Sequence, residues 1–315
     1  MKGSHRIIVE SRKVKYDFVI HRNITIITGD SGSGKTVLID LIHDYGRYGA
    51  DSGVFLSCDC PCKVIDSEDW ERKIEETTGS IIFIDEGNRF LVSKKFAQLV
   101  QGSDNYFVLA TREKLPALPY SVSEIYGFRK SGKFHDAKQK YNEIYHLYGE
   151  ISEEKNINPK LVITEDSNSG FEFFKEMSRQ KGVNCFSAGG KSNIIRQLEQ
   201  RPNEEGTILV IVDGAFGSEM KDISECIKTQ GNIVLYAPES FEWLLLSTKE
   251  IPEVKVETIL QNPEEYIDSK EYISWERYFT DLLIESTSKN FIWAYSKKRL
   301  TKAYFAPRIV NAVKT

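Results

Sequence analysis

The sequence contains no long apolar run. Stretches such as Thr207–Val212 and Asn232–Tyr236 are far shorter than the roughly 18 residues that a membrane-spanning helix needs, so we expect no membrane span. The segment MKGSHRIIVES at the start has neither an apolar core nor a cleavage pattern, and we expect no signal peptide. Cysteine is scarce too: five cysteines, an odd number, in 315 residues make no disulfide framework, and the expected location is the reducing cytoplasm.

The chain also lacks a basic excess. Its 42 Lys and Arg against 46 Asp and Glu give a net charge of −4, which does not indicate nucleic-acid binding by itself. Residues 286–315 differ, because they carry seven basic and no acidic residues among aromatic rings. This segment either binds single-stranded nucleic acid or docks an aromatic face on the protein core with its lysines in water. The aromatic residues are Phe291, Trp293, Tyr295, Tyr304 and Phe305.

Short apolar runs alternate with amphipathic segments along most of the chain, which is typical of the α/β class. A polar stretch ending in proline, residues 149–159, predicts a linker. We therefore expect a sheet domain over residues 1–150, a smaller α/β domain over 158–250 and a helical C-terminal segment over 260–315. The expected strands are Arg6–Val9, Tyr16–Ile20, Asn23–Thr28, Ile81–Ile84, Tyr106–Ala110, Leu161–Thr164, Asn184–Ser187, Ile208–Val212 and Asn232–Tyr236, with a hairpin around Ser131 and Gly132.

A glycine-rich loop follows the third expected strand and matches G-x-x-x-x-G-K-[ST]. Glycines let the backbone curl so that its N–H groups point at phosphate oxygens, and the following helix adds its positive end. We expect Lys35 to reach the β- and γ-phosphates of a nucleotide and the Thr36 hydroxyl to bind Mg²⁺. The nucleotide-binding residues are Gly29, Asp30, Ser31, Gly32, Ser33, Gly34, Lys35 and Thr36.

A second motif, Ile81–Glu86, is an apolar strand that ends in two acids. We expect Asp85 to lie near the metal and Glu86 to orient the attacking water, so that Lys35 and Glu86 are the catalytic residues. A water-orienting group favours hydrolysis over binding alone. After the next strand, Thr111 and Arg112 are candidate sensors of the nucleotide.

These two motifs make residues 5–128 resemble the P-loop NTPases, in particular the ATPase branch that has Walker A and Walker B motifs. The resemblance implies a P-loop sheet domain with ATP and Mg²⁺ as ligands. Asp85 follows Thr36 by only 49 positions, and neither an LSGGQ-like segment nor a long helical insertion is present, which disfavours a transporter or coiled-coil ATPase. The chain also has no N-K-x-D base-reading motif of the GTPases. Candidate arginine fingers are Arg47, Arg89 and Arg112.

In the second alternation, Glu165 follows the first strand and Asp213 follows the third. This order resembles the Toprim domain of topoisomerases, primases and OLD-family nucleases. The resemblance implies that Glu165 and Asp213 bind Mg²⁺ for phosphodiester chemistry. The family's second aspartate is Ala215 here, which removes one ligand unless Asp166, Glu219 or Glu239 replaces it. A Rossmann-like domain whose acids cap helices is the alternative.

Three thiols also lie in five positions, at Cys58, Cys60 and Cys62. Three thiolates bind Zn²⁺, but a closed structural site needs a fourth ligand. His43 or a second subunit is a candidate for it, and reduced turn cysteines are the alternative interpretation.

Two functions are consistent with these patterns. The first is a Mg²⁺-dependent ATPase coupled to DNA or RNA processing through the Toprim-like domain. This pairing distantly resembles the OLD-family proteins, several of which serve in phage defence. In this function ATP binds between subunits, so we expect a homo-oligomer or a partner protein. The second is a nucleotide-gated regulator or scaffold whose Toprim-like domain is inactive.

Overall fold

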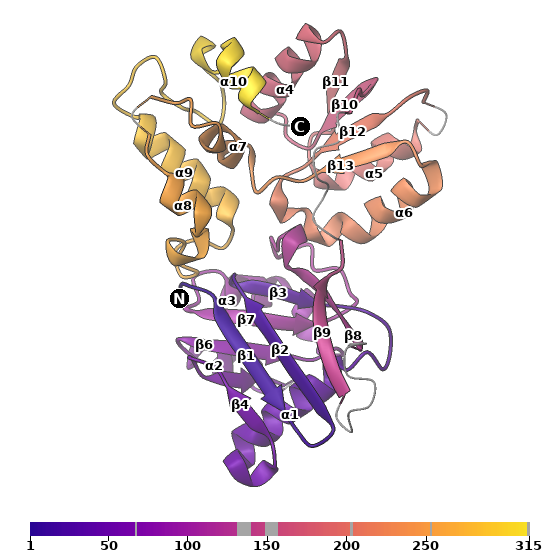
Figure 1. Ribbon diagram of the computed structural model, residues 1–315, viewed down its shortest axis with the longest axis vertical. Coiled ribbons are helices and arrows are strands. Elements are labelled where there is room, and N and C mark those ends of the chain that lie inside the picture. Colours follow the sequence, from indigo (N-terminus) through magenta and orange to yellow (C-terminus); the bar gives the residue numbers. More distant parts are fainter. Residues whose placement is uncertain (67, 131–139, 149–156, 202–203, 253, 314–315) are drawn as a thin grey trace. The chain divides into compact units, whose positions relative to one another are not determined.

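The computed structural model describes residues 1–66, 68–130, 140–148, 157–201, 204–252 and 254–313. The chain forms two compact units, each built from two stretches of sequence. The first unit comprises Met1–Gly149 and Asn262–Ile273, and the second comprises Glu150–Gln261 and Ser274–Thr315. The predicted α/β class is confirmed, because one unit contains a mixed nine-stranded sheet and the other a parallel four-stranded sheet (Figure 1).

The nine-stranded sheet has the order β4-β1-β2-β9-β8-β3-β7-β6-β5. Strands β8, β3, β7, β6 and β5 are parallel neighbours, whereas β1 pairs antiparallel with β2 and β4. β8 and β9 are the antiparallel strands of the expected hairpin, while its proposed turn at Ser131 and Gly132 lies outside the described residues. The strands are β1 (His5–Glu10), β2 (Val14–Ile20), β3 (Ile24–Ile27), β4 (Phe55–Ser57), β5 (Cys62–Val64), β6 (Ser80–Ile84), β7 (Asn105–Ala110), β8 (Ile125–Lys130) and β9 (Lys140–His146).

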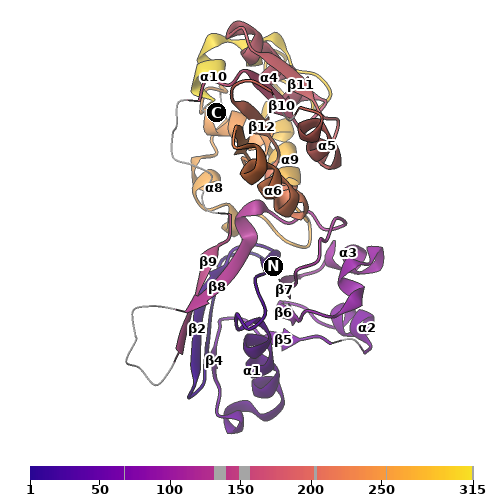
Figure 2. The same cartoon turned by 90° about the vertical axis from the view of Figure 1, so that its right-hand side faces the viewer.

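This sheet curves around α1 (Lys35–Tyr48), which contacts β1 and β4 on one side and β5 on the other (Figure 2). Leu38, Ile39 and Ile42 of α1 are buried in the apolar core between these strands. Two short helices, α2 (Trp70–Glu75) and α3 (Lys94–Val100), cover the parallel strands on the other side, where Phe96 packs on Phe107 of β7 and Trp70 packs on Phe96. The core therefore fixes the helix that follows the glycine-rich loop.

The four-stranded sheet has the order β11-β10-β12-β13, and all its strands are parallel. The chain passes from β10 to β11 at one edge of the sheet, returns to β12 on the other side of β10, and continues to β13 at the opposite edge. Right-handed crossovers therefore put α4 on one face of the sheet and α5 and α6 on the opposite face. The strands are β10 (Leu161–Thr164), β11 (Asn184–Ser187), β12 (Ile208–Ile211) and β13 (Ile233–Tyr236), and the helices are α4 (Ser169–Gln180), α5 (Lys191–Glu199) and α6 (Met220–Gln230).

The C-terminal part does not form one separate segment. Asn262–Ile273 belongs to the first unit, while Ser274–Thr315 packs within the second. Trp293, Tyr295 and Tyr304 are buried there, which agrees with the docking interpretation of the aromatic residues, although Phe291 remains 95% exposed. Burial of these rings explains why the segment joins the sheet unit. The remaining helices are α7 (Phe241–Ser247), α8 (Glu257–Gln261), α9 (Trp275–Thr287) and α10 (Pro307–Ala312).

Candidate functional site

The glycine-rich loop connects β3 to α1, and its backbone depends on residues without a side chain. Gly29, Gly32 and Gly34 have φ angles of 135°, 79° and 106°, which L-residues rarely adopt. The hydroxyl of Tyr16 donates to the Gly34 carbonyl at 2.8 Å, and a Cβ atom on Gly34 would lie 2.8 Å from that hydroxyl oxygen. The hydrogen bond from β2 therefore holds the loop in place. Glycine is required at position 34 because a Cβ atom would clash with Tyr16 and because the φ angle is positive.

Lys35, the first residue of α1, folds back over this loop. Its Nζ donates to the carbonyls of Gly29 at 2.6 Å and Asp30 at 3.2 Å, and to the Ser33 hydroxyl at 3.2 Å. Burial lowers the pKa of Lys35, while the nearby Glu86 carboxylate raises it. The ammonium group thus adds to the positive charge that the N-terminus of α1 provides at this loop.

The side chains of Thr36 and Asp85 lie close together beside the loop. The Thr36 hydroxyl lies 3.5 Å from Asp85 Oδ1, although the two residues are 49 positions apart. Asp85 follows β6, and its carbonyl accepts a hydrogen bond from the Asn88 side chain at 2.9 Å, which fixes the turn. Two oxygen ligands of one octahedral Mg²⁺ lie about 3 Å apart when adjacent and about 4 Å apart when opposite, so this hydroxyl and carboxylate fit such an ion.

Glu86 lies between two cations. Its carboxylate is 3.1 Å from Arg112 Nε and 4.0 Å from Lys35 Nζ. Arg112 reaches it because β7, which precedes this arginine, lies between β3 and β6 in the sheet. Among the three arginines considered from the sequence, Arg112 is the one that forms an ion pair with Glu86. Strand order therefore unites the two sequence motifs and this basic residue.

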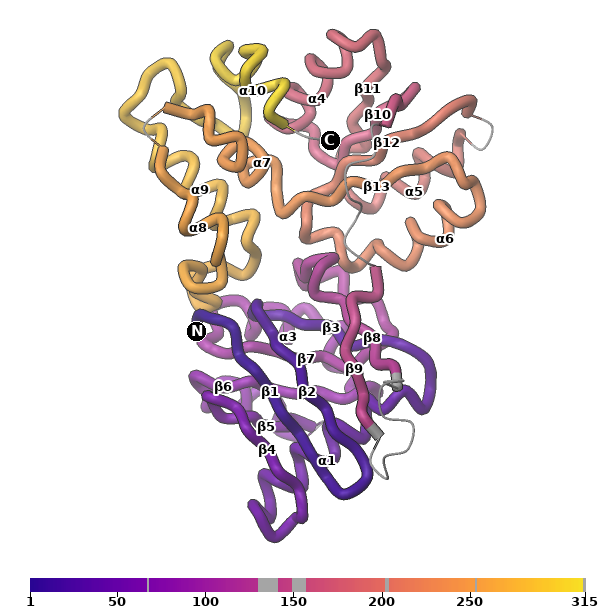
Figure 3. The backbone as a smooth tube through the Cα atoms, in the orientation of Figure 1, coloured from indigo at the N-terminus to yellow at the C-terminus, as the bar shows by residue number. Residues whose placement is uncertain are grey.

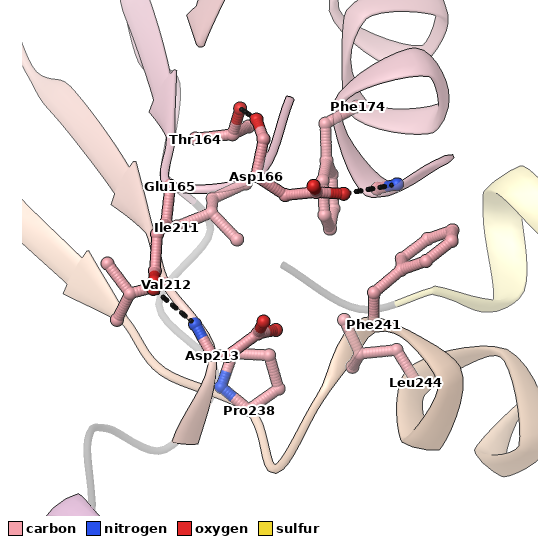
Figure 4. A pocket seen from close by; sticks show the side chains of 11 residues that line it. Thr164, Glu165, Asp166, Phe174, Ile211, Val212, Asp213, Pro238, Phe241 and Leu244 are labelled. Carbon is pink, nitrogen blue, oxygen red and sulfur yellow. Dashed lines mark hydrogen bonds between the residues drawn. The ribbon is translucent and has the colours of Figure 1, made fainter. Parts of the chain in front are cut away.

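In the second unit, Glu165 and Asp213 lie at the carboxyl ends of the adjacent strands β10 and β12. After β10 the chain goes to one edge of the sheet, and after β12 it goes to the other edge. Parallel α/β sheets usually bind ligands at the point where the strand order changes direction in this way. A Glu165 side-chain oxygen accepts a hydrogen bond from the Asp213 backbone N–H at 3.2 Å. Figure 4 shows both carboxylates lining a small pocket, with Phe174, Phe241 and Leu244 on its apolar side.

Burial and like charge disfavour ionisation of this pair. Burial raises the pKa of Glu165 to about 7, although the Asp213 N–H and Lys191 oppose the change. Burial also raises the pKa of Asp213 well above its ordinary value, and Glu276 is the next largest cause. Glu276, on α9, forms an ion pair with Lys297. The structure thus adds to the pair an acid from a distant helix that no sequence motif marked.

Asp166 does not replace the missing ligand at Ala215. Its two carboxylate oxygens accept backbone N–H groups of Asn168 at 2.8 Å and Gly170 at 2.9 Å, so Asp166 holds the start of α4. Figure 4 shows its side chain directed toward that helix. The helix-capping interpretation therefore holds for Asp166, and Glu276 is the acid outside the pair whose charge acts most strongly on both Glu165 and Asp213.

Comparison of the chain with protein-family models and with curated proteins gives no match. Among the helices in the described part of the chain, none combines the length and apolar character needed to cross a membrane.

Proposed function

We propose that the first unit is a P-loop ATPase domain that binds ATP with Mg²⁺ at Gly29–Thr36 and hydrolyses it. The observation that carries the proposal is the convergence of one ammonium, one hydroxyl and two carboxylates around a loop of left-handed glycines. Glycine-rich turns are common, but this arrangement combines the phosphate, metal and water-orienting groups that hydrolysis needs.

Each residue then has a distinct role. Lys35 neutralises the β- and γ-phosphates, and its hydrogen bonds to the loop carbonyls hold its ammonium group beside the loop. Thr36 and Asp85 would hold Mg²⁺, which when bound stabilises negative charge on the phosphate oxygens. Glu86 orients the attacking water, and Arg112 keeps that carboxylate in position through their ion pair.

Nucleotide binding is tested by thermal unfolding with ATP and Mg²⁺. A ligand present at one hundred times its Kd stabilises the folded state by about 2.7 kcal/mol, which raises Tm by about 4 °C for a chain of 315 residues that unfolds as a whole. We expect Lys35→Ala to abolish this shift and Lys13→Ala, an exposed lysine in the β1–β2 turn, to preserve it. A normal shift in Lys35→Ala refutes the phosphate site.

Hydrolysis is tested separately from binding. Glu86→Gln should retain the ATP-dependent shift in Tm and lose phosphate release by at least about 100-fold, since it removes the water-orienting carboxylate. Glu113→Gln, which changes an exposed glutamate that follows β7, should leave the ATP-dependent shift in Tm and the rate of phosphate release unchanged. Wild-type turnover in Glu86→Gln would contradict the assigned role.

We propose further that the second unit is a Toprim-like domain that couples ATP turnover to phosphodiester chemistry on DNA or RNA in a homo-oligomer. Glu165 and Asp213 would hold one divalent cation, which would relieve the repulsion among these two carboxylates and Glu276. The ion pair of Glu276 with Lys297 and the presence of Ala215 instead favour a regulator with an inactive Toprim-like domain.

Cleavage assays with Mg²⁺ or Mn²⁺ distinguish the two functions. Activity on DNA or RNA that disappears in Glu165→Gln and Asp213→Asn, but persists in the exposed-site control Glu199→Gln, supports the nuclease. Absence of cleavage with either metal, together with an intact ATP response, supports the regulator.

A further inference from the structure

Three thiols gather at the junction of β4 and β5, which can be followed in the backbone tube (Figure 3). Cys58, Cys60 and Cys62, here named the cysteine cluster, occupy alternate positions along the turn that leads from β4 into β5. All three pack against the apolar core of the first unit. The histidine that lies beside them is His5, at the start of β1, and not the sequence candidate His43.

Two distances in this group match those between neighbouring ligands of one tetrahedral zinc ion. Cys58 Sγ lies 3.7 Å from Cys60 Sγ, and Cys60 Sγ lies 3.7 Å from His5 Nδ1. Zinc–sulfur and zinc–nitrogen bonds of about 2.3 and 2.0 Å at tetrahedral angles separate two sulfurs by about 3.8 Å and a sulfur from a nitrogen by about 3.5 Å. A disulfide would bring the sulfurs to about 2.05 Å, so both cysteines are thiols here.

Cys62 belongs to the same group of thiols. Its side chain hydrogen-bonds with that of Cys58, and its Sγ lies 4.0 Å from the Cys60 carbonyl oxygen. The three cysteines therefore form one connected group.

The orientation of His5 supplies an independent observation. Its Nε2 is 3.2 Å from the Lys2 carbonyl, to which it can only donate, so in the neutral ring the lone pair is on Nδ1. Nδ1 faces the Asp59 carboxylate at 2.9 Å and the Cys60 sulfur. The Asp59 carboxylate pairs with His5, and His5, Asp59 and Cys60 present three ligand atoms within 4.8 Å of one another, a spacing suited to one metal ion. Donation of the second ring N–H to a backbone carbonyl is also typical of a metal-bound histidine.

We propose that the cysteine cluster and His5 bind one structural Zn²⁺ ion. The ion replaces the thiol protons, which pass to solvent, and no oxidation or reduction takes place. β4 and β5 are the two edge strands of the nine-stranded sheet, and both contact α1. Zinc therefore ties the opposite edges of the curved sheet together beside the helix that follows the phosphate loop, a role separate from ATP binding.

The first test uses the unmodified chain, purified with reductant and without chelator. Metal analysis should find about one zinc per chain. Alkylation followed by peptide mapping should find Cys58, Cys60 and Cys62 protected in the zinc-loaded protein and reactive after chelation, while Cys185 and Cys226 react equally in both. Equal reactivity of all five cysteines with and without zinc overturns the proposal.

A second test uses Co²⁺ as a spectroscopic substitute. The chelator-treated chain should bind one Co²⁺ with the intense absorption of a tetrahedral thiolate site. We expect Cys60→Ser to lose this spectrum, whereas a Cys185→Ser, Cys226→Ser double variant retains it. Failure of the wild-type chain to take up Co²⁺ or Zn²⁺ under reductant refutes the site, and this readout does not depend on whether Cys60→Ser folds.

Discussion

Glu165→Gln should change how the stability of the second unit depends on pH. The pKa of Glu165 is about 7 in the folded protein, against an ordinary value of 4.5. The folded state therefore binds a proton more tightly than the unfolded state, and stability falls as pH rises through this window. At about 1.4 kcal/mol per pKa unit, the wild-type protein should lose at most about 3 kcal/mol that the neutral glutamine does not lose.

Tryptophan fluorescence can follow this unit selectively. Trp243, Trp275 and Trp293 lie in the second unit, so a Trp70→Phe background removes the signal from the first. Urea unfolding with EDTA should give similar stabilities for wild type and Glu165→Gln near pH 4.5, and a more stable variant near pH 8.

The control for this measurement is Glu199→Gln, which changes an exposed glutamate of α5. Its unfolding free energy should follow the wild-type curve at every pH. A constant difference between wild type and Glu165→Gln from pH 4.5 to 8 would show that Glu165 titrates normally, and the reasoning from burial would fail. Because cation binding needs the ionised carboxylate, Mn²⁺ should stabilise the wild-type unit more at pH 8 than at pH 5.

Three further substitutions test the two units. Gly34→Ala should abolish ATP binding measured by calorimetry, because φ is 106° and the added Cβ meets a tyrosine hydroxyl at 2.8 Å, whereas Gly46→Ala, with open space around it, should bind normally; equal binding would contradict the loop geometry. Tyr295→Phe should destabilise the second unit by about 1–3 kcal/mol in urea, since it removes the 2.6 Å hydrogen bond to buried Glu242, and an unchanged midpoint would refute this. Phe173→Ala, at a fully buried position, should cost about 3–5 kcal/mol, and a loss below 1 kcal/mol would show a looser core than the structure has.

Much of the fold follows from local patterns. The β-branched run over Asn23–Thr28 and the apolar run over Ile81–Ile84 predicted β3 and β6 within one or two residues. These strands are buried on both faces, so nearly every residue in them is apolar. The three-residue strands β4 and β5 were not predicted, because FLS and CKV are too short to show a pattern and pair only at the sheet edges.

The sequence predicted the phosphate loop more completely than the sites that contain Glu276 and His5. The phosphate loop is predictable because its contacts are local: Lys35 binds carbonyls only five and six positions away. Glu276 and His5 gave no such signal. Each lies far along the chain from the groups it meets, and single acids or histidines occur in many unrelated surroundings.

The order of residues alone determined the glycine curl, the acid pair after an apolar strand and the alternation of strands and helices, since these rest on neighbours within a few positions. Only the tertiary structure decided which distant groups share a site. Strand order brought Arg112 to Glu86, and the packing of α9 brought Glu276 to Asp213. The physical reason is that burial and Coulomb interactions depend on distance in space, which a linear pattern does not encode.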